Sequence, residues 1–495
     1  MIAASPLSTY EFSDVPNPFP YVPFSAGPVT VVKGQLVRGT TPVLFGGVNA
    51  DFSAICGLLN PKAGTMAMDP AQEAVVAAQV ANMKRAHFSF CRIHGIDLTY
   101  SPIFAAGSTT ALDPVKVQAL SYFIMLLEQA GISYSLDLHY GRVCVPADAP
   151  GTTDPLFLEC VSSAFTSQQM GEVLPWAAYP GVLQTLQAQF VTQVLTAVNP
   201  YTNVPIGYGP GLVFVGITNE RGLTFTATWG YSAHPQLQAA FAADSAAFWA
   251  SYGITKPGAQ EHVQYAIYRE AAWLAPMVAV ARANSHALIV TSNHFGAGPY
   301  SMFANQIAMG DIVDQHCYSY EEATENGLPS WNKFLVDART TDKRSRFAAR
   351  IAGGGWGPPQ AVTEYGFVTQ YRVNGKNLQD PNHERCLGMA SGTHAMVVQG
   401  VQIAAMYSWM HSEIFSEGSP YGTYNDPYDG RFDEVMCVGV QEQMDKFHNP
   451  ALRGVAPVVS VPATYGMLGN EQAILGPDTD PALRLIDPAC RVSIQ

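Results

Sequence analysis

Eight short apolar runs, each followed by a helix-like stretch, restrict the fold of this 495-residue chain more than any other feature. They lie at 43–49, 88–94, 132–139, 212–220, 287–293, 311–318, 360–366 and 401–409. Most are apolar on both faces, which is typical of parallel strands covered by crossover helices. Eight such units favour a closed (β/α)8 barrel, the TIM barrel, over an open doubly wound sheet. No G-x-G-x-x-G motif follows the first run, which argues against dinucleotide binding.

Two helix starts are marked by an aspartate followed by a proline. Asp69 precedes Pro70 and Asp113 precedes Pro114, so each pair offers a capping side chain and a residue suited to the first helical position. Gly131 is expected to end the second of these helices. The apolar face of that helix comprises Val117, Leu120, Ile124 and Leu127.

We expect residues 43–448 to form the barrel, with an N-terminal extension (1–42) whose hairpin caps the barrel bottom and a C-terminal extension (449–495) packed on the barrel. Four segments exceed the usual connection of about 2–6 residues and should build long loops on the catalytic face. They are 140–180, 221–257, 319–341 and 410–430. Their aromatic rings would either stack on a ligand or plug the loops against the barrel. These rings belong to Trp176, Trp229, Trp331, Tyr421, Tyr424 and Tyr428.

The charge pattern excludes two classes of partner. The net charge is −13, charged residues make up 13% of the chain, and we identify no Lys/Arg cluster that would neutralise phosphates or anionic lipid. Nucleic acid and membrane surfaces are therefore not expected partners, and no apolar run reaches the roughly 18 residues of a membrane span. The first residues lack a signal peptide's basic start and apolar core. We expect a secreted or periplasmic protein, with any signal peptide absent from this chain, and a cytoplasmic location stays open. The composition does not indicate an oligomeric state.

The eight cysteines are scattered along the chain and include no C-x-x-C pair, so they do not predict a zinc ribbon. Only Cys144 and Cys160 are placed to bridge one long loop. A disulfide between them and two free thiols are equal alternatives.

Polar side chains gather where the apolar runs stop. Glu220 ends the fourth run and Glu364 lies near the end of the seventh. The C-terminal ends of parallel barrel strands meet at one rim, where barrel enzymes place their catalytic groups. A lone glutamate after a strand is usually a surface residue, but several polar strand ends together favour a site. The other residues at these ends are Arg92, His139, Asn219, His316, Tyr318 and Trp409.

In this order, the residues resemble those of glycoside hydrolase family 5, which belongs to clan A of retaining glycosidases and is cellulase- and mannanase-like. That family carries Arg on strand two, His on strand three, Asn-Glu on strand four, His-x-Tyr on strand six, Glu on strand seven and Trp on strand eight. Here these positions are Arg92, His139, Asn219-Glu220, His316-Cys317-Tyr318, Glu364 and Trp409. The match spans residues 43 to 409. The resemblance implies retention through two carboxyl groups about 5–5.5 Å apart, without a cofactor or a metal.

The resemblance also assigns roles. Glu364 would be the nucleophile and must be ionised, so it needs a nearby cation and a hydrogen-bond donor, for which Arg92 and Tyr318 are the candidates. Glu220 would be the acid/base, protonated first and ionised after the glycosyl-enzyme forms. Asn219 would hydrogen-bond the sugar 2-hydroxyl.

Three further expectations rest mainly on the resemblance. His139 and His316 would orient the sugar and the carboxylates, although hydrogen-bonded core histidines are the alternative. Trp409 would form the floor of the cleaved subsite, or would pack in the core. His94 and Asp97 are outside the family pattern and would shape one end of the cleft.

The expected substrate is a β-linked polysaccharide or its oligosaccharides, with β-1,4-glucan first and mannan next. One rival is a metal-dependent barrel hydrolase, because 12 histidines are present, although no His-x-His follows the first run. The other is a non-catalytic carbohydrate-binding barrel. No G-x-S-x-G elbow or Walker loop supports a serine hydrolase or a nucleotidase.

Overall fold

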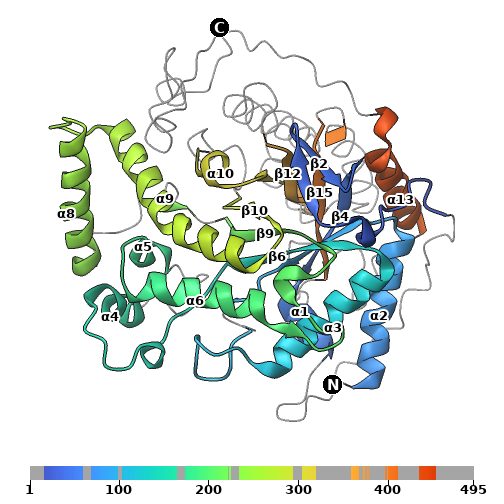
Figure 1. The fold of residues 1–495 in the computed structure, drawn as a ribbon, viewed down its shortest axis with the longest axis horizontal. Coiled ribbons are helices and arrows are strands. Elements are labelled where there is room, and N and C mark those ends of the chain that lie inside the picture. The colour runs from blue at the N-terminus through green and yellow to red at the C-terminus, as the bar shows by residue number, and fades with distance from the viewer. Residues whose placement is uncertain are drawn as a thin grey trace, which may run out of the picture.

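Eight parallel strands form one sheet in the order β10-β9-β6-β5-β4-β15-β12-β11 (Figure 1). The strands are β4 (Phe45–Asp51), β5 (Phe90–His94), β6 (Ser133–His139), β9 (Leu212–Thr218), β10 (Leu288–Val290), β11 (Val313–Tyr318), β12 (Gln360–Gly366) and β15 (Ile403–Met410). The two edge strands meet where the backbone N–H of Asp311, just before β11, donates to the carbonyl oxygen of Ile289 in β10 (2.8 Å). The sheet is thus a nearly closed barrel. The predicted TIM barrel is confirmed, and each predicted run overlaps one strand.

The computed structural model describes residues 16–59, 69–98, 103–163, 173–220, 222–223, 234–293, 304–318, 358–366, 372–373, 376–377, 396–397, 400–410 and 434–452. The described helices lie along the outside of the sheet in Figure 1. They are α1 (Phe52–Leu59), α2 (Pro70–Arg85), α3 (Pro114–Ala130), α4 (Pro155–Ser162), α5 (Leu174–Ala177), α6 (Val182–Thr196), α8 (Pro235–Ser251), α9 (Ala259–Asn284), α10 (Ala304–Met309) and α13 (Glu434–His448). Because crossover helices cover the outside of the sheet, the strands are buried on both faces.

The two predicted helix starts are confirmed. Asp69 accepts a hydrogen bond from the backbone N–H of Ala71, and Asp113 accepts one from Val115, both at 2.9 Å. Gly131 ends α3 in the left-handed conformation, at φ +80°, which glycine adopts without a side-chain clash.

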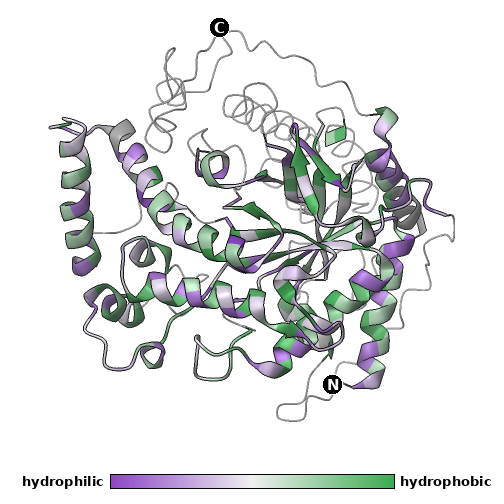
Figure 2. Cartoon of the chain, in the orientation of Figure 1, coloured by the Kyte–Doolittle hydropathy of each residue, from purple (hydrophilic) through white to green (hydrophobic). Residues whose placement is uncertain are grey.

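The bottom of the barrel is closed by an apolar plug. Phe45, Phe90 and Phe214 lie near the N-terminal ends of their strands, and the rings of Phe90 and Phe214 stack with centroids 5.8 Å apart. Below them lie β1 (Val29–Val32), β2 (Gln35–Arg38) and β3 (Thr41–Pro42), whose Leu36 belongs to the same cluster and donates its N–H to Gln402 Oε1 (2.7 Å). Figure 2 shows the apolar character of the central strands. Polar groups inside the barrel are therefore left to its upper, C-terminal half.

Two of the expected long loops contain helices. The segment after β6 carries α4 and α5, and the segment after β9 carries α8. Trp176, on α5, is buried and donates its indole N–H to Glu159 Oε2 of α4 (3.0 Å), so this ring packs inside its own segment. The segments 319–341 and 411–430 lie outside the described residues, as do Trp229, Trp331, Tyr421, Tyr424 and Tyr428.

Cys144 and Cys160 are buried free thiols, which is the second of the two alternatives left by the sequence. Burial raises the pKa of Cys144 to about 11, so this thiol is unreactive at neutral pH. Within the described ranges, the helices are too short or too polar to cross a bilayer.

Candidate active site

The guanidinium of Arg92, fully buried in β5, joins four strand ends. Its Nη1 donates to Asn49 Oδ1 (2.8 Å) and to Glu364 Oε1 (2.5 Å). Its Nη2 donates to Asn219 Oδ1 (2.6 Å) and pairs with a carboxylate oxygen of Asp137. The rigid fork of an arginine can serve several acceptors at once. Arg92 thereby ties the ends of β4, β6, β9 and β12 into one polar cluster at the upper rim.

The two predicted glutamates are brought together beside His316. The Nδ1 atom of His316 lies 2.6 Å from Glu220 Oε1 and 3.3 Å from Glu364 Oε2. One oxygen of each carboxylate and one imidazole nitrogen all lie within 4.8 Å of one another. The side chain of Glu364 is 6% exposed and that of Glu220 is 26% exposed. One carboxylate is therefore enclosed and paired with a cation, while the other reaches solvent.

Burial and neighbouring charges set the protonation of this cluster. Burial alone would lower the pKa of Arg92, but the charges of Asp137 and Glu364 raise it, so the guanidinium stays charged. Burial alone would raise the pKa of Asp137, but Arg92 lowers it, so Asp137 stays ionised. Burial lowers the pKa of His316 to about 3, so its imidazole is neutral. His94 Nδ1 lies 2.9 Å from Asp137 Oδ2, and although burial and Arg92 oppose protonation, Asp137 and Glu364 raise the pKa of His94.

Glu220 has a strained backbone. Its φ is +45°, in the left-handed region that a non-glycine residue enters at a cost of about 1–3 kcal/mol. The side chain of Asn293, just after β10, holds this turn by accepting a hydrogen bond from the Glu220 N–H (2.7 Å). Such outliers persist where surrounding structure imposes them, and they cluster at functional sites. The turn aims the Glu220 carboxylate back toward His316.

Strand irregularities place the second glutamate. The pairing of β11 with β12 shifts between Gln315 and His316, and the pairing of β12 with β15 shifts around Glu364. Bulges next to active sites re-aim side chains that regular alternation would send to opposite faces. Here two consecutive residues both meet His316, since Thr363 Oγ1 lies 3.2 Å from Nε2 while Glu364 lies beside Nδ1.

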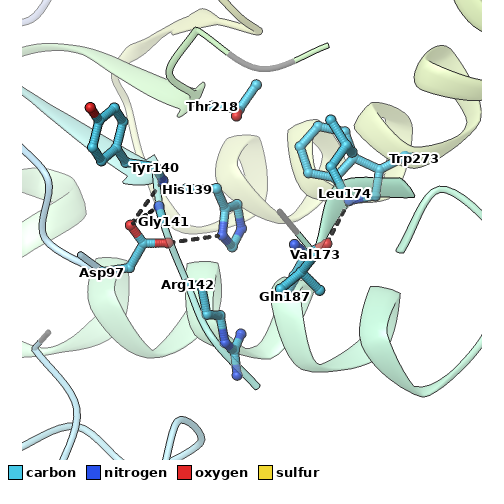
Figure 3. A pocket seen from close by; sticks show the side chains of 10 residues that line it. All are labelled: Asp97, His139, Tyr140, Gly141, Arg142, Val173, Leu174, Gln187, Thr218 and Trp273. Carbon is cyan, nitrogen blue, oxygen red and sulfur yellow. Dashed lines mark hydrogen bonds and ion pairs between the residues drawn. The ribbon is translucent and has the colours of Figure 1, made fainter. Parts of the chain in front are cut away.

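His139 and Asp97 are placed outside this cluster. The His139 ring packs against Phe190 of α6 and Trp273 of α9, with centroids 5.4 and 6.2 Å away. Its Nδ1 lies 3.8 Å from a carboxylate oxygen of Asp97, and Asp97 accepts hydrogen bonds from the backbone N–H groups of Tyr140 and Gly141. Figure 3 shows His139, Asp97 and Trp273 among the residues that line a small pocket between the end of β6 and the helices. Asp97 thus shapes the chain after β6, and His139 packs beside Phe190, Trp273 and Asp97.

Trp409 is also placed elsewhere. Its indole is fully buried, donates to Gln79 Oε1 of α2 (3.1 Å) and meets the ring of Phe88 edge-on at 5.5 Å. The indole therefore packs between the barrel and α2, the position named by the core alternative. Tyr318 ends β11, but its side chain lies outside the described residues. His94 joins the cluster through Asp137.

Several residues of the cluster were not singled out from the sequence. They are Asn49, Asp137, Asn293, Asp314 and Thr363. The available signal was a polar side chain inside an otherwise apolar strand, as in GGVNAD and SYSLDLH. Such a residue must find a hydrogen-bond partner when buried, and the candidates for that partner are other polar strand ends.

A histidine and two carboxylates are also a donor set that a metal ion can use. In this site, however, the Arg92 guanidinium already contacts Glu364 at 2.5 Å and would repel a second cation. We assign no metal here.

The comparisons with known proteins match this chain at the level of the fold. No protein-family profile and no curated protein matches the sequence. A glycoside hydrolase family 5 mannosidase from Rhizomucor miehei has a TM-score of 0.53 at 14% identity, over 85% of this chain and 97% of that chain. An endo-1,4-beta-mannanase from Rhizomucor miehei has a TM-score of 0.50 at 13% identity, over 85% and 99% of the two chains. A GH5_18 structure from Streptomyces cattleya in complex with Manb1-4GlcNAc has a TM-score of 0.50 at 12% identity, over 83% and 82%. At these identities, the similarity establishes the barrel fold.

Proposed function

We propose that the chain is a retaining glycoside hydrolase of the family 5 type, acting on β-linked polysaccharide or oligosaccharide by double displacement. The observation that carries this proposal is the pair of carboxylates at Glu220 and Glu364, whose oxygens approach within 4.8 Å across His316. Retaining glycosidases hold their two carboxyl groups about 5–5.5 Å apart, whereas inverting enzymes need about 6.5–9.5 Å to admit a water. The short separation supports retention.

The different surroundings of the two glutamates support different roles. Glu364 is enclosed and accepts a hydrogen bond from Arg92, which orients its carboxylate, so we assign it the attack on the anomeric carbon. Glu220 reaches solvent and lies beside the neutral His316, so we assign it the proton transfer to the leaving oxygen. In the second step Glu220 takes a proton from water, and that water displaces Glu364 from the sugar.

Asn219 is held in position for a sugar contact. Its Oδ1 accepts from Arg92 (2.6 Å), which orients the amide at the rim next to Glu220. We propose that Asn219 binds the sugar 2-hydroxyl, a contact that strengthens as positive charge develops in the transition state.

We propose β-mannan or manno-oligosaccharides as the first substrate class and β-1,4-glucan as the second, which reverses the order expected from the sequence. The support is the fold similarity to a family 5 mannosidase, to an endo-1,4-beta-mannanase and to a protein solved with Manb1-4GlcNAc. The arrangement of Arg92 and the two glutamates does not distinguish mannose from glucose. These sugars differ in configuration at C2, and the residues around the subsite contact that position.

The test uses Glu220→Gln and Glu364→Gln, with Glu128→Gln as a matched control. Glu128 accepts from the Tyr134 hydroxyl near the bottom of the barrel, so its substitution should leave activity unchanged. On β-1,4-mannan, konjac glucomannan and cellulose oligosaccharides, release of reducing sugar should fall at least about 100-fold in both site variants.

Proton NMR of the first products distinguishes the mechanism. Retained configuration at the new reducing end is expected, and an inverted first product would refute the proposal. A wild-type protein that binds glycan but releases no sugar would instead be a carbohydrate-binding barrel.

A further inference from the structure

A chain of hydrogen bonds runs from Glu220 into the barrel wall. Glu220 Oε1 lies 2.6 Å from His316 Nδ1, and His316 Nε2 lies 3.2 Å from Thr363 Oγ1. The Thr363 hydroxyl donates to Asp314 Oδ2 (2.5 Å), and the Thr363 backbone N–H donates to Asp314 Oδ1 (3.0 Å). His316, Thr363 and Asp314 are completely buried. Water cannot substitute for these partners, so each bond constrains the next.

The direction of one bond fixes the direction of the others. The Thr363 hydroxyl has a single proton, and when that proton is donated to Asp314 the oxygen must accept from His316 Nε2. Because burial lowers the pKa of His316 to about 3, the ring carries only one proton, which then resides on Nε2. The lone pair on Nδ1 therefore faces Glu220 at 2.6 Å. That contact is favourable only if Glu220 carries a proton and donates it.

The same hydrogen bonds can also form with every donor and acceptor exchanged. A proton on Asp314 Oδ2 would be donated to Thr363, whose hydroxyl would then be donated to His316 Nε2. The ring proton would move to Nδ1 and be donated to an ionised Glu220. Burial raises the pKa of Asp314 to about 7, so its carboxyl can hold a proton near neutral pH.

We propose that Thr363 and Asp314 are positioning residues that couple, through the tautomer of His316, the protonation of Glu220 to that of Asp314. Glu220 is protonated when Asp314 is ionised, and it is ionised when Asp314 holds the proton. The inference rests on the proposed role of Glu220 as acid/base. That role needs a carboxyl group that is protonated in the first step and ionised in the second, and a shared proton provides both states.

Other charged groups lie near these hydrogen-bonded residues and influence their pKa values. Arg92 and Asp137 act on both Asp314 and His316, and His94 and Glu364 act on His316. These groups are the same in the wild type and in the variants below. A shift in the pH profile of a variant therefore reports the hydrogen bonds that link Glu220 to Asp314.

The test replaces the two inner residues. Thr363→Val removes the hydroxyl at nearly constant volume, and His316 then gains more from donating Nδ1–H to the two carboxylates, which favours ionised Glu220. Asp314→Asn places an amide donor toward Thr363 and imposes the same direction. Thr363→Ser keeps the hydroxyl. Thr291→Val is the matched control, because Thr291 is buried at the end of β10 and its Oγ1 makes no hydrogen bond to the described residues.

Two substrates distinguish proton transfer from simple damage. In Thr363→Val and Asp314→Asn, kcat/KM on mannopentaose should fall about tenfold, and the basic limb of its pH profile should move about one unit lower, as expected when one hydrogen bond of about 1.4 kcal/mol favours the ionised form. The leaving group of 2,4-dinitrophenyl β-mannobioside needs little protonation, so kcat for its glycosylation should change less than twofold. Thr363→Ser and Thr291→Val should resemble the wild type on both substrates.

Equal losses on both substrates, or an unmoved basic limb in Thr363→Val, would overturn the coupling. Glu220→Gln, assayed on the same two substrates, separates this failure from failure of the proposed function. If Glu220→Gln loses mannopentaose activity but keeps activity on the activated substrate, Glu220 is the acid and only the coupling has failed. If Glu220→Gln is fully active on mannopentaose, the acid assignment itself is wrong.

Discussion

The substitution of Arg92 gives the sharpest test of the site, because its guanidinium serves four acceptors while fully buried. In Arg92→Met, the carboxylates of Asp137 and Glu364 remain, with side chains only 1% and 6% exposed, and lose their shared cation. Removing one partner of a buried ion pair costs about 3–5 kcal/mol. That is a large part of the roughly 5–15 kcal/mol that stabilises a typical domain.

Arg92→Lys separates charge from geometry. A lysine ammonium keeps the positive charge, but one nitrogen cannot contact all the acceptors that the two guanidinium nitrogens contact. These acceptors extend from Asn49 on β4 to Asn219 after β9. At least one charge-assisted hydrogen bond should be lost, at a cost of about 1.5–3 kcal/mol. If that bond is the one to Glu364, kcat/KM on mannopentaose falls by about 10- to 150-fold.

The free energy of unfolding is measured by urea denaturation, with tryptophan fluorescence as the probe. For the variants that remain folded, kcat/KM is measured as well. Arg282→Met is the control, because Arg282 is 46% exposed and pairs with Asp311 at 3.0 Å, a surface ion pair worth about 0–1 kcal/mol. If Arg92→Met is no less stable than Arg282→Met, the buried network does not hold the rim together and the reasoning is refuted.

Three further outcomes can be checked. Trp409→Phe should lower the free energy of unfolding by about 1–3 kcal/mol, because the hydrogen bond to Gln79 is lost and a cavity is left. It should leave kcat/KM on mannopentaose within twofold of the wild type. A large rise in KM would instead show that the indole contacts the substrate. Because the native pKa of His316 is lowered to about 3, the unfolded state binds its proton first. The unfolding free energy should therefore fall by up to about 1.4 kcal/mol per unit as the pH drops from about 6.5 toward 3, and urea titrations of His316→Gln should lack this part of the slope. Dialysis against EDTA should leave activity intact, and activity that disappears and returns with zinc would revive the metal-dependent alternative.

The strands and helix starts were predictable because their signals are local. Apolar runs such as 360–366 must be buried on both faces, and an aspartate before a proline caps a helix in most contexts, as at Asp69 and Asp113. The meeting of Glu220 with Glu364 followed from topology alone, since parallel strands bring their C-terminal ends to one rim.

The direction of individual side chains was not predictable in the same way. Trp409 and His139 stand at strand ends as expected, yet one packs against α2 and the other against α6 and α9. Asn49 and Asp137 carry no motif, and only the buried guanidinium of Arg92 shows that they belong to the site. Near the rim, the face on which a residue lies depends on pairing register and packing rather than on alternation.

The sequence by itself therefore determined the barrel and the rim at which its two glutamates converge, because burial and chain direction act through patterns that are readable within a few residues. Only the tertiary structure decided which polar groups share Arg92, how Thr363 and Glu364 both meet His316, and how Asn293 holds the strained turn of Glu220. Those contacts join residues from different strands through bulges and hydrogen bonds of fixed direction, and no local pattern specifies them.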